Sequence, residues 1–377
     1  MSNVRLGIIG LGSMGLTHAR NVLAGKLTGL DLAAVADPDA RTHAQLPGIR
    51  AYADAHDLIG SGTVDAVLIA TPHFSHTSLG IAALQAGLHV LVEKPISAHK
   101  ADAERLIAAH TRPGQIFAAM FNQRTDPYYQ EIKKLIQTGA LGQIRRINWV
   151  ITDWFRTSAY YASAGWRATW EGEGGGVLLN QCPHNLDMLQ WLFGQPERVR
   201  AFCHFGRYHQ IEVEDDLTAY LEFPGGATGV FIGSTGEAPG TNRLEIAGER
   251  GRLVYENDEI SFLQNEEEMT RFSRRAPQPF ARPATVHRPI RMPDHGGQHV
   301  AILQNFADAI RLGVPVIAPG REGIYSVELA NAMLLSTWRE QTIELPLSGA
   351  EYEAALKTRI AASAFRTSPA PLLPKNS

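Results

Sequence analysis

The spacing of apolar and polar positions changes about a third of the way along the chain. Before that point, continuous apolar runs predict buried strands at residues 4–9, 30–36, 64–70, 89–92 and 116–121. Segments with helical spacing alternate with them at residues 14–24, 76–86 and 101–110. Such alternation is typical of a parallel sheet covered by helices on both faces. Residues 1–124 are therefore predicted to form an α/β domain.

A different pattern predicts a second domain over residues 125–350. A helix is expected at residues 127–138, with Pro127 in its first turn. Short strands separated by tight turns follow at residues 144–152, 199–205, 217–223, 227–235, 244–247, 252–256 and 259–263. Residues 266–298 carry few periodic signals and predict a long excursion, after which helices resume at 299–311 and 323–339. The pattern favours an α+β domain with a mostly antiparallel sheet and helices on one side.

Composition narrows the class of protein. The 377 residues suffice for two domains, and residues 351–377 are left as a C-terminal segment whose tail, 368–377, is expected to be frayed. A net charge of −3 and the lack of a long apolar stretch predict neither a nucleic-acid nor a membrane partner. The N-terminus leaves no room for a signal peptide, and two cysteines form no disulfide framework. A cytoplasmic location is therefore expected.

A glycine turn lies between the first predicted strand and the first helix. In Gly10-Leu-Gly12-Ser-Met-Gly15, the first glycine permits a tight turn, the second permits close approach of a pyrophosphate, and the third permits close helix packing. Asp37 ends the next strand, about 20 residues further on, where a carboxylate binds ribose hydroxyls and repels a 2′-phosphate. The motif predicts NAD in preference to NADP. The alternative is an ordinary strand–helix turn with Asp37 as a cap.

Lys94 follows the strand at residues 89–92, in the sequence Glu93-Lys94-Pro95. The ends of parallel strands open onto the crevice where such folds bind ligands. Burial would lower the lysine pKa, so that Lys94 becomes a candidate general base or electrostatic clamp for a substrate hydroxyl. The alternative is a surface lysine paired with Glu93. No lysine occurs between Lys134 and Lys357, which makes Lys94 the best-placed ammonium group for a site between the domains.

A triple glycine, residues 174–176, precedes a third group of polar residues. A helix from Val177 would place Asn180, His184 and Asp187 on one face. His184 is then a candidate proton shuttle, with Asn180 binding a substrate hydroxyl and Asp187 orienting His184. The alternative is a capped helix with an ordinary core histidine.

These motifs together resemble the Gfo/Idh/MocA family of glucose–fructose oxidoreductase and inositol dehydrogenase relatives. The matching features are the glycine turn, Asp37-Pro38, Thr71-Pro72-His73, Glu93-Lys94-Pro95 and the Gly-Gly-Gly…His184-x-x-Asp187 block. The resemblance implies a Rossmann domain, an open-faced C-terminal sheet, a nicotinamide cofactor and a homodimer or homotetramer. It implies catalytic roles for Lys94 and His184. Cofactor-binding residues are predicted to be Gly10, Gly12, Ser13, Met14, Gly15, Asp37, Thr71, Pro72, His73, His76, Glu93, Lys94, Asn122, Trp166 and Arg167.

Asn180 departs from the family pattern, because many members have aspartate at this position. An amide takes up no proton at neutral pH, so the proton relay would run through His184, Lys94 or water. Asn180 is retained in the predicted catalytic group with Lys94 and His184, chiefly as a binding residue.

Aromatic and arginine residues suggest the substrate. Four tryptophans at positions 149, 154, 166 and 170 lie near Arg156 and Arg167, a combination that suits a sugar but also an ordinary core with a polar rim. Six arginines between Arg271 and Arg291 suit an anionic sugar, or an arm that grips a neighbouring subunit. No metal is predicted, since His73 and His76 lack a carboxylate cluster. Predicted substrate contacts are Lys94, Asn122, Trp154, Arg156, Arg167, Asn180 and His184.

Three functions are consistent with these residues. The first is an NAD-dependent oxidoreductase acting on a hydroxyl of a sugar, sugar derivative or cyclic polyol. The second is an NAD-dependent, redox-assisted glycoside hydrolase, on a glycoside that carries a sulfonate, phosphate or uronic acid group. The third is a nucleotide-sensing regulator without turnover, which the pairing of Lys94 with His184 argues against.

Overall fold

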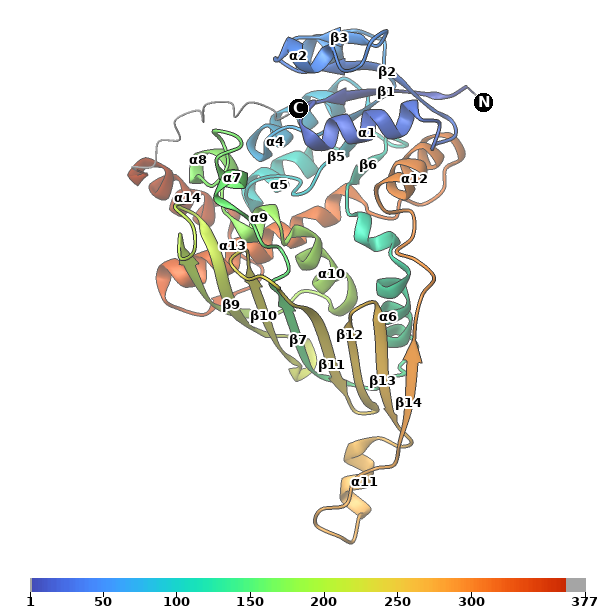
Figure 1. Cartoon of the computed structure of the whole chain (residues 1–377), viewed down its shortest axis with the longest axis vertical. Coiled ribbons are helices and arrows are strands. Elements are labelled where there is room, and N and C mark those ends of the chain that lie inside the picture. Colours follow the sequence, from blue (N-terminus) through green and yellow to red (C-terminus); the bar gives the residue numbers. More distant parts are fainter. Residues whose placement is uncertain (1, 364–377) are drawn as a thin grey trace.

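Six parallel strands form the sheet of the N-terminal domain in the computed structural model, which describes residues 2–363. Their order is β3-β2-β1-β4-β5-β6, and the central strands are almost wholly buried because helices lie on both faces (Figure 1). The strands are β1 (Val4–Ile9), β2 (Leu30–Ala36), β3 (Arg50–Tyr52), β4 (Ala66–Ile69), β5 (His89–Val92) and β6 (Phe117–Ala119). The helices are α1 (Ser13–Leu23), α2 (Ala40–His43), α3 (Ala55–Gly60), α4 (His73–Gln85) and α5 (Lys100–Ala108).

Nine strands form the second sheet, in the order β14-β13-β12-β11-β7-β10-β9-β8-β15. All neighbours are antiparallel except β7 and β10, which run parallel. The strands are β7 (Ile144–Ile151), β8 (Arg198–Phe205), β9 (Glu214–Glu222), β10 (Thr228–Ser234), β11 (Asn242–Gly248), β12 (Gly251–Glu256), β13 (Glu259–Asn265), β14 (Thr285–Ile290) and β15 (Ile343–Glu344). Trp149 illustrates the alternation, since it is fully buried between the more exposed Asn148 and Val150.

Helices cover one face of this sheet (Figure 1). The longer ones are α6 (Pro127–Gln137), α10 (Pro183–Phe193), α13 (Gly323–Arg339) and α14 (Gly349–Ala362). The chain also contains short helical segments at α7 (Ser158–Tyr161), α8 (Trp170–Glu173), α9 (Val177–Asn180), η1 (Asn122–Thr125), η2 (Pro224–Gly226) and η3 (Gly320–Glu322). Within residues 2–363, no helix has the length and apolar character needed to cross a membrane.

Helix α12 (Gln298–Leu312) follows the second sheet in sequence but packs against the first. Its buried residues Ile302, Leu303 and Phe306 join the hydrophobic core of the N-terminal domain. Just beyond it, the amide of Ala119 in β6 donates a hydrogen bond to the carbonyl of Ala318 at 2.9 Å. The chain therefore returns to complete the core of its first domain.

The predicted fold class is confirmed, with a parallel sheet followed by a mostly antiparallel one. The excursion at residues 266–298 was incompletely predicted, because it contains α11 (Met269–Arg275) and the edge strand β14. Strand β14 is exposed at every position but the last, so it lacks the alternation by which strands are recognised. The short elements α2, β3 and α3 were also missed. The tail predicted to fray lies outside the described residues.

Candidate functional site

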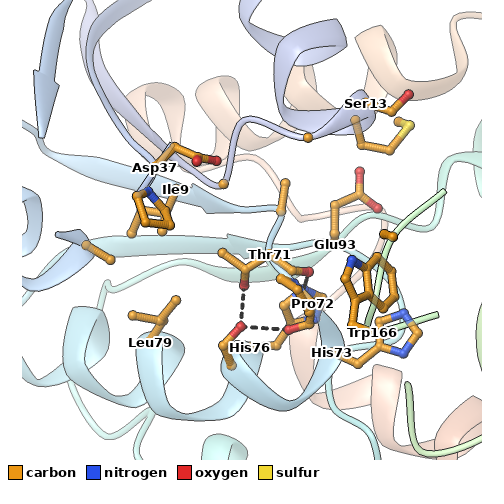
Figure 2. Close-up of a pocket in the computed structure, with 18 of the residues that line it drawn as sticks. Ile9, Ser13, Asp37, Thr71, Pro72, His73, His76, Leu79, Glu93 and Trp166 are labelled. Carbon is orange, nitrogen blue, oxygen red and sulfur yellow. Dashed lines mark hydrogen bonds between the residues drawn. The ribbon is translucent and has the colours of Figure 1, made fainter. Parts of the chain in front are cut away.

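A cavity of about 800 Å³ opens where β1, β2, β4 and β5 end (Figure 2). Ligands of open α/β sheets bind at this edge of the sheet, outside the carboxyl ends of the strands. The cavity is lined on the sheet side by Gly10, Gly12, Ser13, Met14, Asp37, Thr71, Pro72, His73, His76, Glu93 and Lys94. Tyr160, Ser163, Trp166, Arg167 and Asn180 line it from the second domain. Most of the predicted cofactor-binding residues thus surround one space.

The glycine turn has the geometry that a dinucleotide requires. Gly10 has a φ of +90°, and a Cβ on Gly15 would lie 1.9 Å from the carbonyl oxygen of Gly10. A Cβ on Gly12 would meet no atom within 4 Å, so its backbone is open toward the cavity. Helix α1 begins at Ser13 without a side-chain cap, which leaves its first N–H groups available to phosphate oxygens.

Asp37 supports the turn from the end of β2. Its carboxylate accepts hydrogen bonds from the amides of Leu11 at 2.6 Å and Asp39 at 2.8 Å, and it lines the cavity. These bonds leave acceptor capacity for ribose hydroxyls, whereas the negative charge disfavours a 2′-phosphate. The turn, the free helix N-terminus and Asp37 therefore fit NAD.

Two buried histidines hold the loop after β4. His73, at the start of α4, lies with Nδ1 3.1 Å from the carbonyl oxygen of Glu173. His76 lies between the carbonyl oxygens of Pro95 and Thr71, at 2.8 and 2.7 Å. Burial and the nearby His76 lower the pKa of His73 to about 3, and burial also lowers the pKa of His76. His73 is therefore neutral and joins the loop to Glu173, while the two ring nitrogens of His76 face main-chain oxygens on either side of it.

Glu93 and Lys94 extend from the end of β5 in different directions. The Glu93 carboxylate lies 2.6 Å from Nε2 of His18. Burial would raise the pKa of Glu93, but the hydrogen bond with His18 and the charges of His18 and Lys94 lower it to about 2. The Lys94 amine donates a hydrogen bond to the main-chain oxygen of Asn180 at 2.7 Å. Burial lowers the pKa of Lys94, while the charges of Glu93 and Glu173 oppose that shift. Lys94 is thus a partly desolvated amine inside the cofactor cavity.

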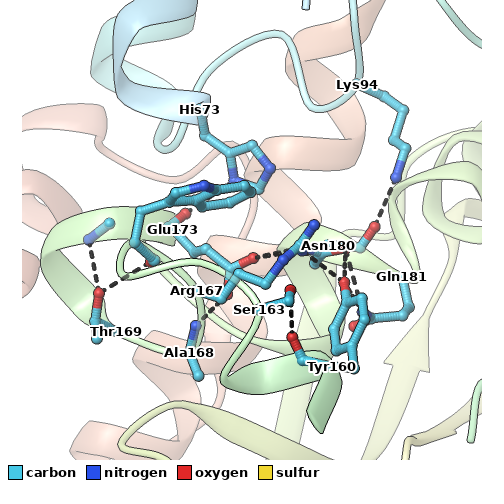
Figure 3. Close-up of polar contacts among 12 residues, drawn as sticks. His73, Lys94, Tyr160, Ser163, Arg167, Ala168, Thr169, Glu173, Asn180 and Gln181 are labelled. Carbon is cyan, nitrogen blue, oxygen red and sulfur yellow. Dashed lines mark hydrogen bonds and ion pairs between the residues drawn. The ribbon is translucent and has the colours of Figure 1, made fainter. Parts of the chain in front are cut away.

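A polar network surrounds Asn180 (Figure 3). Its Nδ2 donates to the carboxylate of Glu173, and its Oδ1 accepts from the hydroxyl of Tyr160 and from Nε2 of Gln181, each at 3.1 Å. Arg167 Nη1 donates to the Tyr160 hydroxyl at 2.8 Å. Burial raises the pKa of Glu173 to about 7, against the opposing hydrogen bonds from Ala168 and Asn180.

His184 lies in α10, and only 8% of it is exposed. Its Nδ1 has no hydrogen-bond partner among the described residues. Burial, and then the charge of Lys94, lower the pKa of His184 well below its usual range, so the imidazole is neutral.

The predicted single helix from Val177 through Asp187 is wrong. Helix α9 ends at Asn180 and α10 begins at Pro183, whose missing N–H cannot continue the hydrogen-bond ladder. Asp187 does not orient His184; it forms a buried ion pair with Arg124, with N–O distances of 2.8 and 2.6 Å.

The remaining predicted residues are not among the described lining of the cavity. Asn122 donates to Gln298 at 2.6 Å, and Gly15 packs behind the glycine turn. The Arg156 guanidinium lies over the rings of Trp154 and Tyr160, at 5.3 and 5.0 Å. Roles for Asn122, Trp154, Arg156 and His184 stay predictions. Residues 2–363 hold no group of three or more acidic, histidine or cysteine side chains suited to a metal ion.

Sequence reasoning missed Glu173, Tyr160 and Gln181 as members of the site. The triple glycine and the predicted residues Trp166, Arg167 and Asn180 pointed to this region, but nothing local indicates that α8 meets α9 through a side-chain contact. Tyr160 lies in the aromatic stretch between Trp154 and Trp166, but no role was predicted for it.

The parallel sheet, its glycine turn and the lysine in the cavity define a two-domain NAD-binding oxidoreductase. The chain belongs to the Gfo/Idh/MocA family. Residues 4–121 match the oxidoreductase family with an NAD-binding Rossmann fold, and residues 129–254 match the GFO/IDH/MocA C-terminal domain. The resemblance drawn from the motifs is confirmed.

Two inositol dehydrogenases and one solved dehydrogenase are similar to this chain along most of their length. Myo-inositol 2-dehydrogenase of Thermotoga maritima is 25% identical over 351 residues, covering 91% of this chain and 98% of that protein. Inositol 2-dehydrogenase 1 of Saccharopolyspora erythraea is 38% identical over 267 residues, covering 66% of this chain and 73% of that protein. The WlbA dehydrogenase from Bordetella pertussis, solved with NADH and UDP-GlcNAcA, has a TM-score of 0.77 at 26% identity, covering 92% of this chain and 100% of that chain.

Proposed function

We propose that this oxidoreductase transfers a hydride between a hydroxyl-bearing carbon of a sugar, sugar derivative or cyclic polyol and the nicotinamide of NAD. The observation that carries the proposal is the position of Lys94, whose amine lies in the cofactor cavity and is bonded to Asn180 of the second domain. The two inositol dehydrogenases support a polyol or sugar substrate. They also favour a dehydrogenase over the redox-assisted glycoside hydrolase.

NAD supplies the hydride acceptor when it is bound. Lys94 faces the cavity and stabilises the oxygen that loses its proton, because a nearby ammonium favours a developing alkoxide. His184, kept neutral by burial, is in the form that accepts the proton. In the alternative assignment the two roles are exchanged, and neutral Lys94 is the base.

A substrate screen tests the proposal. Sugars, polyols and acidic glycosides are each incubated with NAD or NADP. We expect NADH to form with at least one free sugar or polyol. Release of aglycone from a synthetic glycoside without net NADH would instead identify the glycoside hydrolase, and no reaction with any compound would contradict both.

Lys94→Met tests the central residue. We expect kcat/KM to fall roughly 100- to 10,000-fold, the usual contribution of an acid–base group, while NAD affinity changes little. Lys134→Met is the matched control, because the Lys134 side chain is 67% exposed and lies outside the cavity. Equal activity of Lys94→Met and wild type would remove Lys94 from the mechanism.

We also propose that the chain forms a homodimer or homotetramer in the cytoplasm. The family resemblance supports the assembly, and the two buried free thiols, Cys182 and Cys203, suit a reducing compartment. Sedimentation equilibrium would measure the number of subunits, and a monomer at micromolar concentration would contradict the assembly.

A further inference from the structure

Glu173 is a buried carboxylate that the proposed reaction leaves without a role. It ends α8, and only 2% of it is exposed. Its Oε2 accepts a hydrogen bond from the amide of Ala168 at 2.6 Å, and its Oε1 accepts one from Nδ2 of Asn180 (Figure 3). Arg167 Nη1 lies 3.8 Å from Oε1, beyond hydrogen-bond distance. A carboxylate so deeply buried is costly unless its charge and bonds are used.

One of these bonds shapes the wall of the cavity. Ala168 has a φ of +60°, a conformation that a residue with a Cβ keeps only when its surroundings hold it. Glu173 binds the amide of this residue, directly after Trp166 and Arg167, which line the cavity. A Cβ on Gly172 would lie 1.9 Å from the carbonyl oxygen of Trp166, so α8 packs tightly against the same loop.

The other bond sets the orientation of Asn180. Because Nδ2 points to Glu173, Oδ1 is free to accept from Tyr160 and Gln181. The main-chain oxygen of the same residue accepts from the Lys94 amine. An amide carries no charge, so the acid on this side of Lys94 is Glu173, one residue beyond Asn180 in the chain of contacts.

We propose that Glu173 is a positioning residue that orients the Asn180 side chain beside the Lys94 amine and, in its ionised form, supplies negative charge that favours the protonated amine. This inference rests on the role of Lys94 in the proposed function. A neutral side chain could also accept the two hydrogen bonds that Glu173 accepts. The proposed role is therefore a role for its negative charge.

Other charges face both groups and must stay unchanged in a test. Glu173 is faced by Lys94, Arg167, Glu214 and Tyr161. Lys94 is faced by two acids, two arginines and four histidines: Glu93, Glu173, Arg156, Arg167, His73, His76, His184 and His299. A substitution that keeps the shape of residue 173 isolates its charge from this set.

A charge exchange between positions 173 and 180 provides that substitution. In Glu173→Gln, the new amide oxygen still accepts from Ala168, but its NH₂ group meets the NH₂ group of Asn180. In the double variant Glu173→Gln/Asn180→Asp, the Gln amide donates to the new carboxylate, which still accepts from Tyr160 and Gln181. The double variant therefore satisfies the same hydrogen bonds and restores one negative charge beside Lys94.

The readout is the pH dependence with which acetic anhydride acetylates Lys94, followed by mass spectrometry on the protein without substrate. Only the unprotonated amine reacts, so the profile reports the pKa of Lys94. We expect Glu173→Gln to shift the profile to lower pH by about one unit, a tenfold change in acidity, because a favourable negative charge is lost. The double variant should shift it back. Glu212→Gln is the control, since Glu212 accepts a hydrogen bond from the amide of Trp170 in the same helix at 2.7 Å and is not among the charges that face Lys94.

An unchanged profile in folded Glu173→Gln would overturn the proposal, and so would a double variant that folds but keeps the shifted profile. If Glu173→Gln fails to fold, the double variant alone decides, because its profile must lie at or above that of the wild type. The assay needs no substrate, so a failed substrate screen leaves it intact. A shifted profile together with a fully active Lys94→Met variant would retain the electrostatic link and reject the proposed function.

Discussion

Asp37 shows how one side chain selects a cofactor. Its charge lies at the end of β2, facing the cavity, and is held by two backbone amides. Asp37→Asn keeps an acceptor but removes the charge. We expect NAD affinity to fall roughly 10- to 100-fold, the range for losing a hydrogen bond to a charged group, while NADP loses less. Fluorescence titration measures the affinities for NAD and for NADP, with Asp39→Asn as the control. An unchanged preference for NAD over NADP would contradict the assignment.

The titration of the buried His73 side chain makes the free energy of unfolding depend on pH. The pKa of His73 is about 3 in the folded protein and 6.5 in the unfolded chain. Its contribution to the free energy of unfolding is therefore complete above pH 6.5 and is lost as the pH falls toward 3. His73→Asn retains a donor toward the oxygen of Glu173. On going from neutral pH to about pH 5, the wild type should lose about 2 kcal/mol more unfolding free energy than the variant. Urea denaturation at the two pH values measures this difference, and parallel losses would show that His73 is not responsible.

Helix α12 follows the second sheet in the chain but packs against the first sheet. Phe306 is 1% exposed and packs in the core beneath the first sheet. Phe306→Ala should lower the unfolding free energy by about 3–5 kcal/mol, the usual cost of such a cavity. Leu312→Ala on the same helix, where the side chain is 57% exposed, is the control. Denaturant unfolding compares them, and equal small losses would mean that α12 does not support the core.

At the scale of the whole molecule, a buried ion pair joins the segment between the domains to the second domain. Arg124 in η1 pairs with Asp187 in α10, both side chains 0% exposed, and contacts Glu322 as well. Asp187→Leu leaves a buried guanidinium short of its main partner and should cost about 3–5 kcal/mol. Arg124→Met/Asp187→Leu should recover much of that loss. Thermal unfolding tests the pair, and a double variant no better than the single one would argue against coupling.

Elements with a strong local period were predicted closely. The strands Leu30–Ala36 and His89–Val92 and the helix Gly323–Arg339 have the bounds expected from their apolar spacing. Strand β14 was missed because it is exposed, and the helix through Asp187 was predicted as continuous although Pro183 interrupts it. Strand β14 thus offered no periodic pattern to detect, whereas at Pro183 a missing backbone donor outweighed a pattern that was present.

The order of residues alone established the parallel first sheet, the glycine turn, Asp37 as its companion and Lys94 at the edge of a strand, because each depends on neighbours within a few positions. Tertiary structure decided the rest. Lys94 meets Asn180 across 86 residues, Glu173 turns toward Asn180, and Asp187 binds Arg124 in place of orienting His184. Contacts of this kind depend on how helices and sheets dock, and a buried polar group takes whichever partner that docking brings within reach.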